Sequence, residues 1–557
     1  MNFLDTRRLL YGPWQAFERD VARLLIASGF DDVRIVGGTG DKGADVLGTT
    51  GGSLWVYQCK FTSNSSPPTD AVDEVVEAGR YYHADRLWVA TSRPIGDALW
   101  ERIKYYARQG LSIEVAQPED LIRLVTTAPE YPRSRLTLYD YQEQAATNLR
   151  SGLLDTGRAL IVLATGLGKT LVMAETVAEL LRDNLIDCGR VLVLAHTVPI
   201  VSQLHRSFWH QLPKWVPTHQ LSEGEIPSYW DGITFATMQS ALARSDELPT
   251  FGLVLIDEAH HVGADTYQDL LQRLRPIMLG GVTATPWRGD GYDIEQTLGP
   301  PLIRVGIAEG LQRGFLSDVS YRLLADNIDW EVVQDRSRFR YAISELNSKL
   351  ILPIRDEKAA QIIAEVFASN RRRAGLIFTR SIEHANAFAG TLRSYGFRAE
   401  PISSEMNPRE RDSLMSRFRA GRLDLICAVD LFNEGVDFPD VDLIAFMRVT
   451  HSRRIFVQQL GRGLRVRPGK ENLVVLDFVT DLRRIAEVLS LDRAVRGGDV
   501  ERVGLGGHLI EFTDHGAGDF LKDWLLDQAS LFEREGDPVL ELPQFNYPQP
   551  QPPGNVQ

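Results

Sequence analysis

A glycine-rich loop between an apolar run and a helical pattern constrains the fold of this chain more than any other feature. Residues 159–163 read Ala-Leu-Ile-Val-Leu, and residues 164–170 read Ala-Thr-Gly-Leu-Gly-Lys-Thr. In a strand–loop–helix unit of this kind, backbone N–H groups surround phosphates, the lysine reaches the β- and γ-phosphates, and the threonine hydroxyl binds Mg²⁺. The sequence therefore predicts a nucleotide site in an α/β domain. The loop residues expected to contact the nucleotide are Thr165, Gly166, Gly168, Lys169 and Thr170.

A second motif follows another apolar run and completes this chemistry. Residues 253–256 read Leu-Val-Leu-Ile, and residues 257–260 read Asp-Glu-Ala-His. At the end of a buried strand, Asp257 would hold Mg²⁺ and Glu258 would polarise the attacking water. A chance Gly-Lys-Thr turn is rarely followed by this motif at strand-end spacing, so the pair predicts ATP hydrolysis.

Four further segments occur in the order of the superfamily 2 helicase motifs. They are Tyr141-Gln142, residues 283–286 (Thr-Ala-Thr-Pro), residues 430–439 and residues 458–465. The chain resembles that superfamily over residues 136–481, and it is most similar to the motor subunits of type I and type III restriction enzymes and their helicase relatives. One departure is Leu163, which stands where the general phosphate-loop pattern begins with glycine.

The resemblance implies roles for residues outside the two motor motifs. Gln142 would read the adenine, residues 283–286 would couple the two halves of the motor, and Asp437 would belong to the nucleotide site. Arg462 and Arg465 are three positions apart on a predicted helix, so they share a face. Both would approach the γ-phosphate as arginine fingers.

The charge distribution is compatible with a nucleic-acid partner. The net charge is −13, but residues 498–557 carry eleven acidic and three basic residues, whereas residues 448–470 carry seven Lys or Arg and no acidic residue. A basic surface can therefore exist on this acidic protein. By resemblance, residues 196–203 and 237–240 would hold the DNA backbone, and His260 would couple the motor domains.

Length and cysteine content narrow the class of protein. A chain of 557 residues is long enough for several domains. No apolar run approaches the ~20 residues of a membrane span, and the first residues contain no apolar signal-peptide core. Three scattered cysteines argue against a disulfide framework or a zinc site. We therefore expect a cytoplasmic protein with no membrane partner.

The first 130 residues show a separate pattern of elements. An amphipathic helix is predicted over residues 14–29, and residues 43–47 and 54–60 are expected to form a β-hairpin. Gln58 and Lys60 are two positions apart in the second hairpin strand. They should therefore point to the same face of the sheet.

These elements can carry metal-assisted phosphodiester hydrolysis. Asp45 would hold Mg²⁺, a cation that prefers oxygen ligands, with Glu18 and the carbonyl of Cys59 completing the shell. Lys60 would orient or deprotonate the attacking water and offset developing charge. The Cys59 side chain should point to the opposite, packed side of the strand, which favours a core residue over a nucleophile.

The N-terminal pattern resembles the Mrr-like branch of the PD-(D/E)xK nucleases over residues 12–127. In that branch glutamine commonly replaces the second acid, as Gln58 does here. The resemblance implies a DNA endonuclease of type II or type IV character with Asp45, Gln58, Lys60 and Glu18 as catalytic residues. A degenerate nuclease fold that only binds DNA is the alternative, because each of these residue types is common on strands and turns.

The predicted fold class is α/β, with an N-terminal PD-(D/E)xK nuclease domain and two RecA-like parallel-sheet motor domains. The alternation of strands and helices in the motor indicates parallel sheets whose ligand lies at the carboxyl ends of the strands. The expected segments are the nuclease domain (1–130), the ATP-binding domain (131–316), a connecting segment (317–355), the second motor domain (356–496) and an acidic, proline-rich tail (497–557). Residues 128–135 are expected to link nuclease and motor.

These features predict an ATP-dependent DNA translocase or helicase coupled to a Mg²⁺-dependent DNA endonuclease, in a prokaryotic restriction or anti-phage defence system. Its cofactors would be ATP and Mg²⁺, and its partners DNA and defence-system proteins that recognise the target. Two alternatives stay open: a DNA-repair helicase with a binding-only N-terminal domain, and an ATP-gated scaffold that recruits an effector. Metal-dependent DNA cleavage would distinguish the translocase–nuclease from both alternatives. DNA-stimulated ATPase activity would distinguish the translocase–nuclease and the repair helicase from the scaffold.

Overall fold

The computed structural model describes most of the first 317 residues and separate parts of the remainder. The described residues are 2–36, 43–63, 65–222, 224–284, 292–317, 319–323, 327–328, 340–342, 351–352, 356–369, 372–403, 405–419, 421–429, 441–447, 470, 472–478 and 539–541. They belong to two compact units: Met1–Leu163 with Gly168–Arg304, and Ala164–Leu167 with Val305–Gln557.

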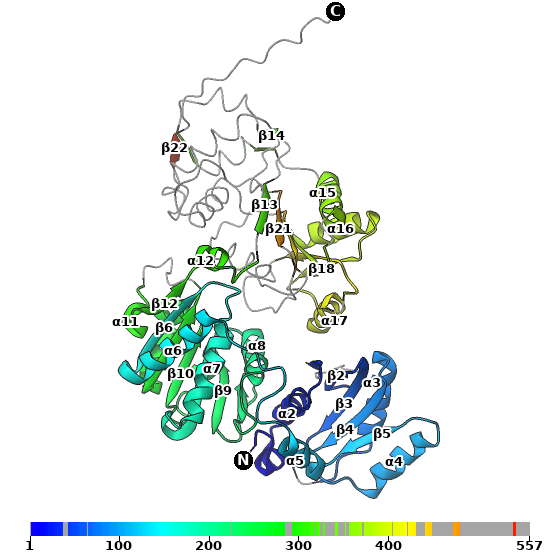
Figure 1. Cartoon of the computed structure of the whole chain (residues 1–557). Helices are drawn as coiled ribbons and strands as arrows, with labels where there is room; N and C mark the ends of the chain where they lie inside the picture. Colours follow the sequence, from blue (N-terminus) through cyan, green and yellow to red (C-terminus); the bar gives the residue numbers. More distant parts are fainter. Residues whose placement is uncertain are drawn as a thin grey trace, which may run out of the picture. The chain divides into compact units, whose positions relative to one another are not determined.

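The N-terminal part of the first unit is built on a five-stranded sheet (Figure 1). Its strands, in spatial order, are β1 (Asp32–Ile35), β2 (Val46–Thr50), β3 (Ser53–Lys60), β4 (Arg86–Thr91) and β5 (Ile113–Ala116). β1, β2 and β3 are antiparallel neighbours, whereas β3, β4 and β5 run parallel. The predicted hairpin is confirmed, but its first strand starts at Val46 instead of Gly43, which lies in the preceding turn with φ of +80°.

Helices cover both faces of this sheet. One apolar core contains residues of α1 (Thr6–Tyr11), α2 (Trp14–Ala27) and α5 (Pro118–Thr127), and the other contains residues of α3 (Asp70–Tyr82) and α4 (Asp97–Ala107). Side chains along β3 point alternately to the two faces of the sheet, so successive residues belong to different cores. Tyr57 and Cys59 pack in the core with α2, and Val56 packs in the core with α3. The prediction that Cys59 is a packed residue is therefore confirmed.

The remainder of the first unit is built on a seven-stranded sheet. Its strands, in spatial order, are β12 (Pro301–Val305), β6 (Arg158–Leu163), β11 (Met278–Thr283), β10 (Leu253–Asp257), β7 (Arg190–Ala195), β9 (Gly232–Thr237) and β8 (Thr218–Leu221). All neighbours from β6 to β8 are parallel, as the sequence predicted. Residues that follow β10 and β11 therefore lie at one edge of the sheet, where parallel sheets bind their ligands.

Helices and two short 3₁₀ turns connect these strands. They are α6 (Asp140–Thr156), α7 (Lys169–Arg182), η1 (Asp187–Gly189), α8 (Val198–Trp209), α9 (Met238–Ala243), η2 (Ala259–Gly263), α10 (Asp265–Leu274) and α11 (Glu295–Leu298). None of the described helices of the chain combines the length and apolar character that a bilayer crossing requires.

Residues 128–135, which the sequence predicted as a linker, are held by hydrogen bonds and ion pairs. The backbone N–H of Lys214 donates to the carbonyl of Glu130 at 2.7 Å. The Lys214 ammonium donates to the carbonyls of Thr126 and Ala128, each at 2.6 Å. Arg135 pairs with Glu175 of α7 at 2.6 Å. The segment is thus fixed to the seven-stranded part instead of spanning solvent.

The second unit contains a six-stranded sheet. Its strands, in spatial order, are β13 (Val319–Leu323), β21 (Leu473–Asp477), β20 (Leu443–Phe446), β17 (Gly375–Phe378), β19 (Leu425–Val429) and β18 (Ala399–Ser403). Every neighbouring pair is parallel, which completes the predicted α/β class. The helices among the described residues of this unit are α12 (Ile307–Gln312), α15 (Asp356–Ser369), α16 (Ile382–Ser394) and α17 (Pro408–Arg419).

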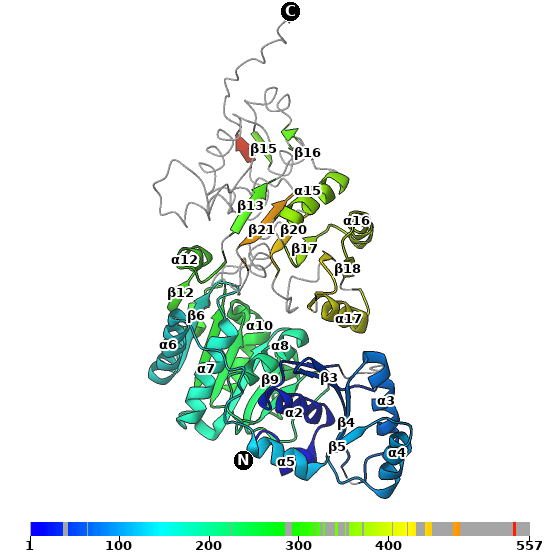
Figure 2. The same cartoon turned by 45° about the vertical axis from the view of Figure 1, so that its right-hand side comes forward.

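Two segments of the second unit differ from the predicted organisation. β13 comes from the predicted connecting segment, yet it forms an edge of the six-stranded sheet. Part of the predicted C-terminal tail, β22 (Val539–Glu541), pairs with β15 (Arg340–Ala342). A second short ladder joins β14 (Asn327–Ile328) to β16 (Ile351–Leu352). One strand of each ladder, β15 and β16, is labelled in Figure 2.

Candidate functional sites

The predicted phosphate loop joins β6 to α7. Gly166 and Gly168 have φ of +93° and +82°. Residues with a Cβ rarely adopt these backbone angles, which explains why glycine stands at both positions. Gly168 precedes Lys169, the first residue of α7. A Cβ at Gly168 would lie 2.4 Å from the side-chain nitrogen of Gln142, so the structure brings Gln142 to the start of this helix.

Gln142 is positioned by its own neighbours on α6. Its side-chain oxygen accepts a hydrogen bond from the backbone N–H of Tyr139 at 3.0 Å, and its nitrogen donates to the Tyr141 hydroxyl at 3.2 Å. The first of these bonds satisfies the backbone N–H of the N-cap residue of α6, as in a capping box. Gln142 is 4% exposed. Its side chain is therefore held beside the N-terminus of α7.

The second motif lies where β10 ends. Lys169 Nζ is 3.8 Å from Glu258 Oε1, and His260 Nδ1 is 3.3 Å from Glu258 Oε2. His260 Nδ1 is also 3.0 Å from the hydroxyl of Thr283, at the end of β11. Glu258 has φ of +50°, which is unusual for a residue with a side chain and is typical of strained functional positions. The structure thus joins three predicted motifs through side chains.

Two adjacent carboxyl groups at this strand end have opposite shifts in pKa. Burial, together with the neighbouring Glu258 carboxylate, raises the pKa of Asp257 to about 7. Burial acts in the same direction on Glu258, but Lys169 and His260 outweigh it and hold the pKa of Glu258 below its usual range. A buried carboxyl beside a second carboxylate is suited to a divalent cation, because the cation offsets the combined negative charge. Asp257 has this character.

Asp437, Arg462 and Arg465 lie outside the described residues, as do Thr285 and Pro286 of the predicted coupling motif. Their predicted roles stay predictions.

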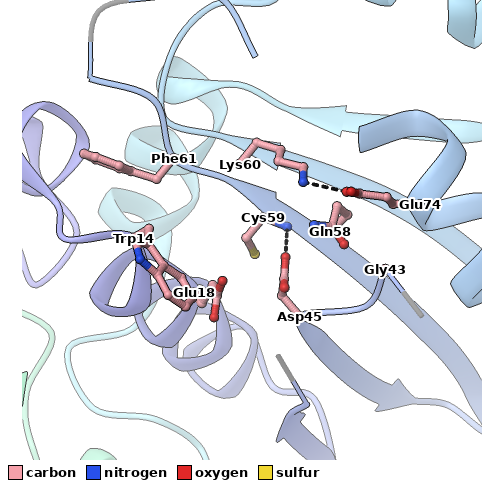
Figure 3. Close-up of a pocket in the computed structure, with 9 residues that line it drawn as sticks. All are labelled: Trp14, Glu18, Gly43, Asp45, Gln58, Cys59, Lys60, Phe61 and Glu74. Atoms are coloured by element: carbon pink, nitrogen blue, oxygen red, sulfur yellow. Dashed lines mark hydrogen bonds and ion pairs between the residues drawn. The ribbon is translucent and has the colours of Figure 1, made fainter. Parts of the chain in front are cut away.

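The nuclease-like part contains a pocket of about 310 Å³ that collects the four predicted residues (Figure 3). The lining residues are Trp14, Glu18, Gly43, Asp45, Gln58, Cys59, Lys60, Phe61 and Glu74. Glu18 reaches the pocket from α2, Asp45 from the turn before β2, and Lys60 from the end of β3. The four predicted residues therefore line one pocket although Glu18 and Lys60 are 42 positions apart in the sequence.

Hydrogen bonding orients Asp45. Its Oδ2 accepts a bond from the backbone N–H of Cys59 at 2.6 Å. Gln58 is 5% exposed, and its side-chain oxygen has no hydrogen-bond partner among the described residues. A buried acceptor without a donor is costly unless a ligand satisfies it. Gln58 therefore presents an oxygen that a bound cation or water can use.

The oxygen groups of this pocket suit Mg²⁺. Among the described residues, no three His, Cys, Asp or Glu side chains are grouped closely enough to hold a metal by themselves. Mg²⁺ does not require such a group, because it keeps several waters and commonly takes one or two carboxylates with substrate phosphates. Asp45, Glu18 and the Gln58 oxygen would be its protein ligands.

Glu74 is a pocket residue that sequence reasoning missed. It lies on α3, and its Oε2 is 2.5 Å from the ammonium of Lys60 (Figure 3). A Cβ at Gly43 would lie 2.4 Å from the backbone carbonyl of Glu74, so the glycine allows the Asp45 turn to approach α3. Nothing in the sequence pattern of this helix marks Glu74 among its several acidic residues. The packing of α3 on β3 brings Glu74 to Lys60.

Family models match three separate parts of the chain. Residues 11–125 match a family described as restriction endonuclease, in its Mrr catalytic form. Residues 135–288 match the res subunit of type III restriction enzymes, and residues 357–467 match the helicase conserved C-terminal domain.

Three curated relatives each match between 61% and 66% of this chain. IRC3 of Saccharomyces cerevisiae is 23% identical over 364 residues, which cover 61% of this chain and 51% of that protein. The irc3 protein of Schizosaccharomyces pombe is 27% identical over 397 residues, which cover 66% of this chain and 61% of that protein. DNA 3'-5' translocase XPB2 of Sulfurisphaera tokodaii is 26% identical, with 62% of this chain and 82% of that protein covered. The chain thus spans less than two thirds of the first two relatives.

Among solved structures, one similar chain belongs to LlaBIII, an ATP-dependent type ISP restriction-modification enzyme bound to DNA. The two chains superpose with a TM-score of 0.54, covering 94% of this chain and 42% of that chain. Their identity is 16%, so the likeness concerns the fold.

Proposed function

Because this chain joins superfamily 2 helicase domains to an N-terminal Mrr-like restriction endonuclease domain, we propose that it is an ATP-driven DNA translocase or helicase that also cleaves DNA in a Mg²⁺-dependent reaction. A prokaryotic restriction or anti-phage defence system is the setting that this combination favours. The observation that carries the proposal is the pocket that gathers Glu18, Asp45, Gln58 and Lys60 in a chain that also has a phosphate-loop motif.

The motor half of the proposal assigns ATP and Mg²⁺ to the edge of the seven-stranded sheet. The phosphate loop would bind the phosphates, with Lys169 neutralising the β- and γ-phosphates. Thr170 and Asp257 would hold Mg²⁺, and Glu258 would orient the attacking water. The contacts of Glu258 with Lys169 and His260 support this assignment, since they fix the carboxylate beside the loop. Gln142, beside the start of α7, would face the adenine.

The remaining motor residues are proposed from sequence resemblance. Arg462 and Arg465 would stabilise charge that develops on the γ-phosphate, and Asp437 would belong to the nucleotide site. The printed name of the relative XPB2, a DNA 3'-5' translocase, supports translocation on DNA as part of the proposal.

The nuclease half assigns hydrolysis of a phosphodiester bond to the pocket in Figure 3. Asp45, Glu18 and the side-chain oxygen of Gln58 would hold Mg²⁺, which supplies Lewis-acid activation of the phosphate and lowers the pKa of a bound water. Lys60 would orient the attacking water and offset negative charge on the phosphate. The arrangement of these four residues around one pocket supports catalysis over a domain that only binds DNA.

Partners and location belong to the same proposal. DNA is the substrate, and proteins of the defence system would recognise the target. A cytoplasmic location fits three cysteines that are all free in the structure.

One experiment tests the proposal and separates it from its alternatives. Purified protein is incubated with plasmid and with short linear DNA, with and without Mg²⁺ and ATP, and both ATP hydrolysis and strand cleavage are measured. We expect DNA-stimulated ATPase and Mg²⁺-dependent cleavage. ATPase without cleavage of any substrate, with or without candidate partner proteins, would favour the repair helicase with a binding-only domain. Absence of DNA stimulation would favour the scaffold.

A further inference from the structure

Helix α2 carries Glu18 into the nuclease pocket and also contacts the seven-stranded part of the same unit. Successive helical residues are rotated by about 100°, so neighbours on a helix face different surroundings. Glu18 lines the pocket, whereas Arg19, Asp20 and Arg23 belong to contacts that involve residues 213–225. Figures 1 and 2 both show α2 between the five-stranded sheet and the seven-stranded sheet.

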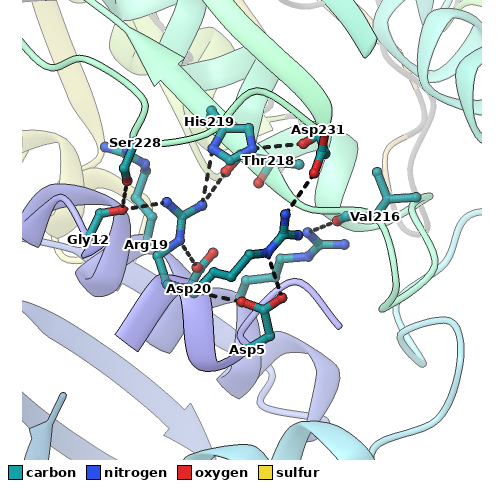
Figure 4. A network of polar contacts seen from close by, with 12 residues as sticks. Asp5, Gly12, Arg19, Asp20, Val216, Thr218, His219, Ser228 and Asp231 are labelled. Atoms are coloured by element: carbon teal, nitrogen blue, oxygen red, sulfur yellow. Dashed lines mark hydrogen bonds and ion pairs between the residues drawn. The ribbon is translucent and has the colours of Figure 1, made fainter. Parts of the chain in front are cut away.

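A buried charge network centres on Arg8, and Figure 4 labels its partners Asp20, Thr218 and His219. Arg8 donates to Asp20 of α2 at 2.6 Å and to the carbonyl of Thr218 at the start of β8 at 2.9 Å. The same guanidinium lies 3.3 Å from Nδ1 of His219, whose Nε2 is 2.8 Å from the carbonyl of Asp231. Burial, followed by the charge of Arg8, lowers the pKa of His219, so a neutral ring accepts from Arg8. One guanidinium therefore joins α2 to β8.

Two further arginines of α2 bind the seven-stranded part directly. Arg19 forms a two-point pair with Glu225, with one of its contacts at 2.8 Å. Arg23 donates to the backbone carbonyls of Val216 at 2.7 Å and Pro213 at 3.1 Å. Bidentate pairs of this kind fix orientation as well as distance.

Apolar packing crosses the same boundary. Trp209, the last residue of α8, belongs to the core that also contains Phe17 and Val21 of α2. It is 2% exposed. The backbone N–H of Phe3 also donates to the carbonyl of Lys214 at 2.8 Å. The nuclease-like core is therefore incomplete without a side chain from the motor.

These contacts leave α2 little freedom to shift. Arg8 and Asp20 are 0% and 1% exposed, and a buried ion pair that loses one partner leaves an uncompensated charge. Sliding of α2 would separate several such pairs at once and would open the core around Trp209. Any displacement of α2 would also displace Glu18, which is 9% exposed and lies on the adjacent face.

We propose that the first motor domain is a structural part of the nuclease site: by binding α2 through Arg19 and the Arg8–Asp20 network, it sets the position of Glu18. Arg19 and Glu225 are positioning residues, not catalytic ones. This inference rests on the proposed nuclease function, and it makes cleavage depend on docking of α2 and not only on ATP turnover.

A charge-reversal cycle in the full-length protein tests the proposal. The variants are Arg19→Glu, Glu225→Arg and the double variant with both changes. Binding of Mn²⁺ is measured by electron paramagnetic resonance of the free ion, without nucleotide, and binding that Asp45→Ala removes is assigned to the nuclease pocket. DNA cleavage and ATP hydrolysis are measured on the same samples.

We expect each single variant to weaken Asp45-dependent Mn²⁺ binding and cleavage by about 10-fold or more, the scale seen when a residue that orients a metal ligand is lost. ATPase should change by less than about twofold, because the nucleotide loop shares no contact with this pair. The double variant should recover metal binding and cleavage, since a pair of opposite sign is restored. Glu18→Gln combined with Arg19→Glu should be no worse than Glu18→Gln alone, because both changes act through Glu18.

The control is the pair formed by Arg86 and Glu114 on the exposed surface of the same sheet. Arg86→Glu makes the same charge change without touching α2 and should leave metal binding and cleavage at the wild-type level. If Arg19→Glu fails to fold, Glu225→Gln replaces it, since this change removes the charge and keeps the side-chain size. Thermal unfolding midpoints identify variants that fold.

The outcomes separate this inference from the proposed function. Folded single variants that bind Mn²⁺ and cleave like wild type would overturn the positioning role while leaving the nuclease intact. The same holds for a loss that the double variant does not recover. Absence of any Asp45-dependent Mn²⁺ binding in the wild-type protein would overturn the proposed metal site, and this inference with it.

Discussion

The nucleotide site and the nuclease pocket belong to neighbouring parts of one chain but are assembled in different ways. The nucleotide site uses short contiguous motifs at the ends of parallel strands, so Lys169 and Glu258 meet because β6 and β10 belong to one sheet. The nuclease pocket uses single residues from a helix, a turn, a strand and a second helix. Its geometry depends on packing between elements, including contacts with the motor. The first site should therefore tolerate changes in distant packing better than the second.

The largest effect is expected when a motif residue of the nucleotide site is removed. Lys169→Ala should abolish ATP hydrolysis, because the loop loses its phosphate charge partner. The measurement is steady-state ATPase with saturating DNA, and Lys104→Ala, an exposed lysine paired with Glu101, is the matched control. Wild-type, DNA-stimulated activity in Lys169→Ala would contradict the motor assignment. Cleavage that continues unchanged in this variant would show that the pocket works without the motor's ATP cycle.

A comparable loss is expected in the other site. Asp45→Asn keeps an oxygen that can accept the Cys59 N–H bond but loses the charge that Mg²⁺ requires. It should reduce cleavage to the level seen without metal, while ATPase stays within about twofold because the described residues of the two sites belong to different sheets. Lys60→Ala should show the same loss of cleavage as Asp45→Asn, with ATPase again nearly unchanged. Asp97→Asn, at an exposed position on α4, is the control. Cleavage by Asp45→Asn at the wild-type rate would exclude this pocket as the nuclease site.

The arginine residues predicted from motif resemblance should have the next largest effect. Arg462→Ala or Arg465→Ala should lower the ATP turnover number by about 1000-fold, the lower end of the arginine-finger effect, with a much smaller change in ATP affinity. The reason is that a finger acts mainly on charge in the transition state. Single-turnover hydrolysis and nucleotide binding are compared. Unchanged turnover in both variants would remove them from the active site.

The smallest predicted effect concerns Glu74, the residue selected by packing alone. Glu74→Gln removes the charge partner of the Lys60 ammonium, so Lys60 should lose its fixed orientation. We expect cleavage turnover to fall by about 10-fold with little change in KM for DNA. Glu77→Gln, on an exposed position of the same helix, is the control. A fall in Glu74→Gln that appears only in KM would instead indicate a role in DNA binding.

Local patterns predicted the parts of the fold that depend on local geometry. The hairpin of β2 and β3, the helix α2 and the parallel motor strands followed from period-two and helical patterning. Patterns could not predict that β13 joins the six-stranded sheet or that β22 pairs with β15. Short strands carry too few residues for periodicity, and their partners lie far away in the sequence.

The amino-acid sequence by itself determined the chemistry of this protein: the phosphate loop, the Asp-Glu-Ala-His segment, and the residue types of the nuclease pocket. It did so most completely for the two motor motifs, because the residues of each motif are placed by their spacing along one backbone. Only the tertiary structure decided that Glu74 contacts Lys60, that Trp209 completes the core around α2, and that residues 128–135 are held against the motor. These contacts join distant segments. They depend on how whole helices and strands pack against one another, and no single segment of the sequence contains that information.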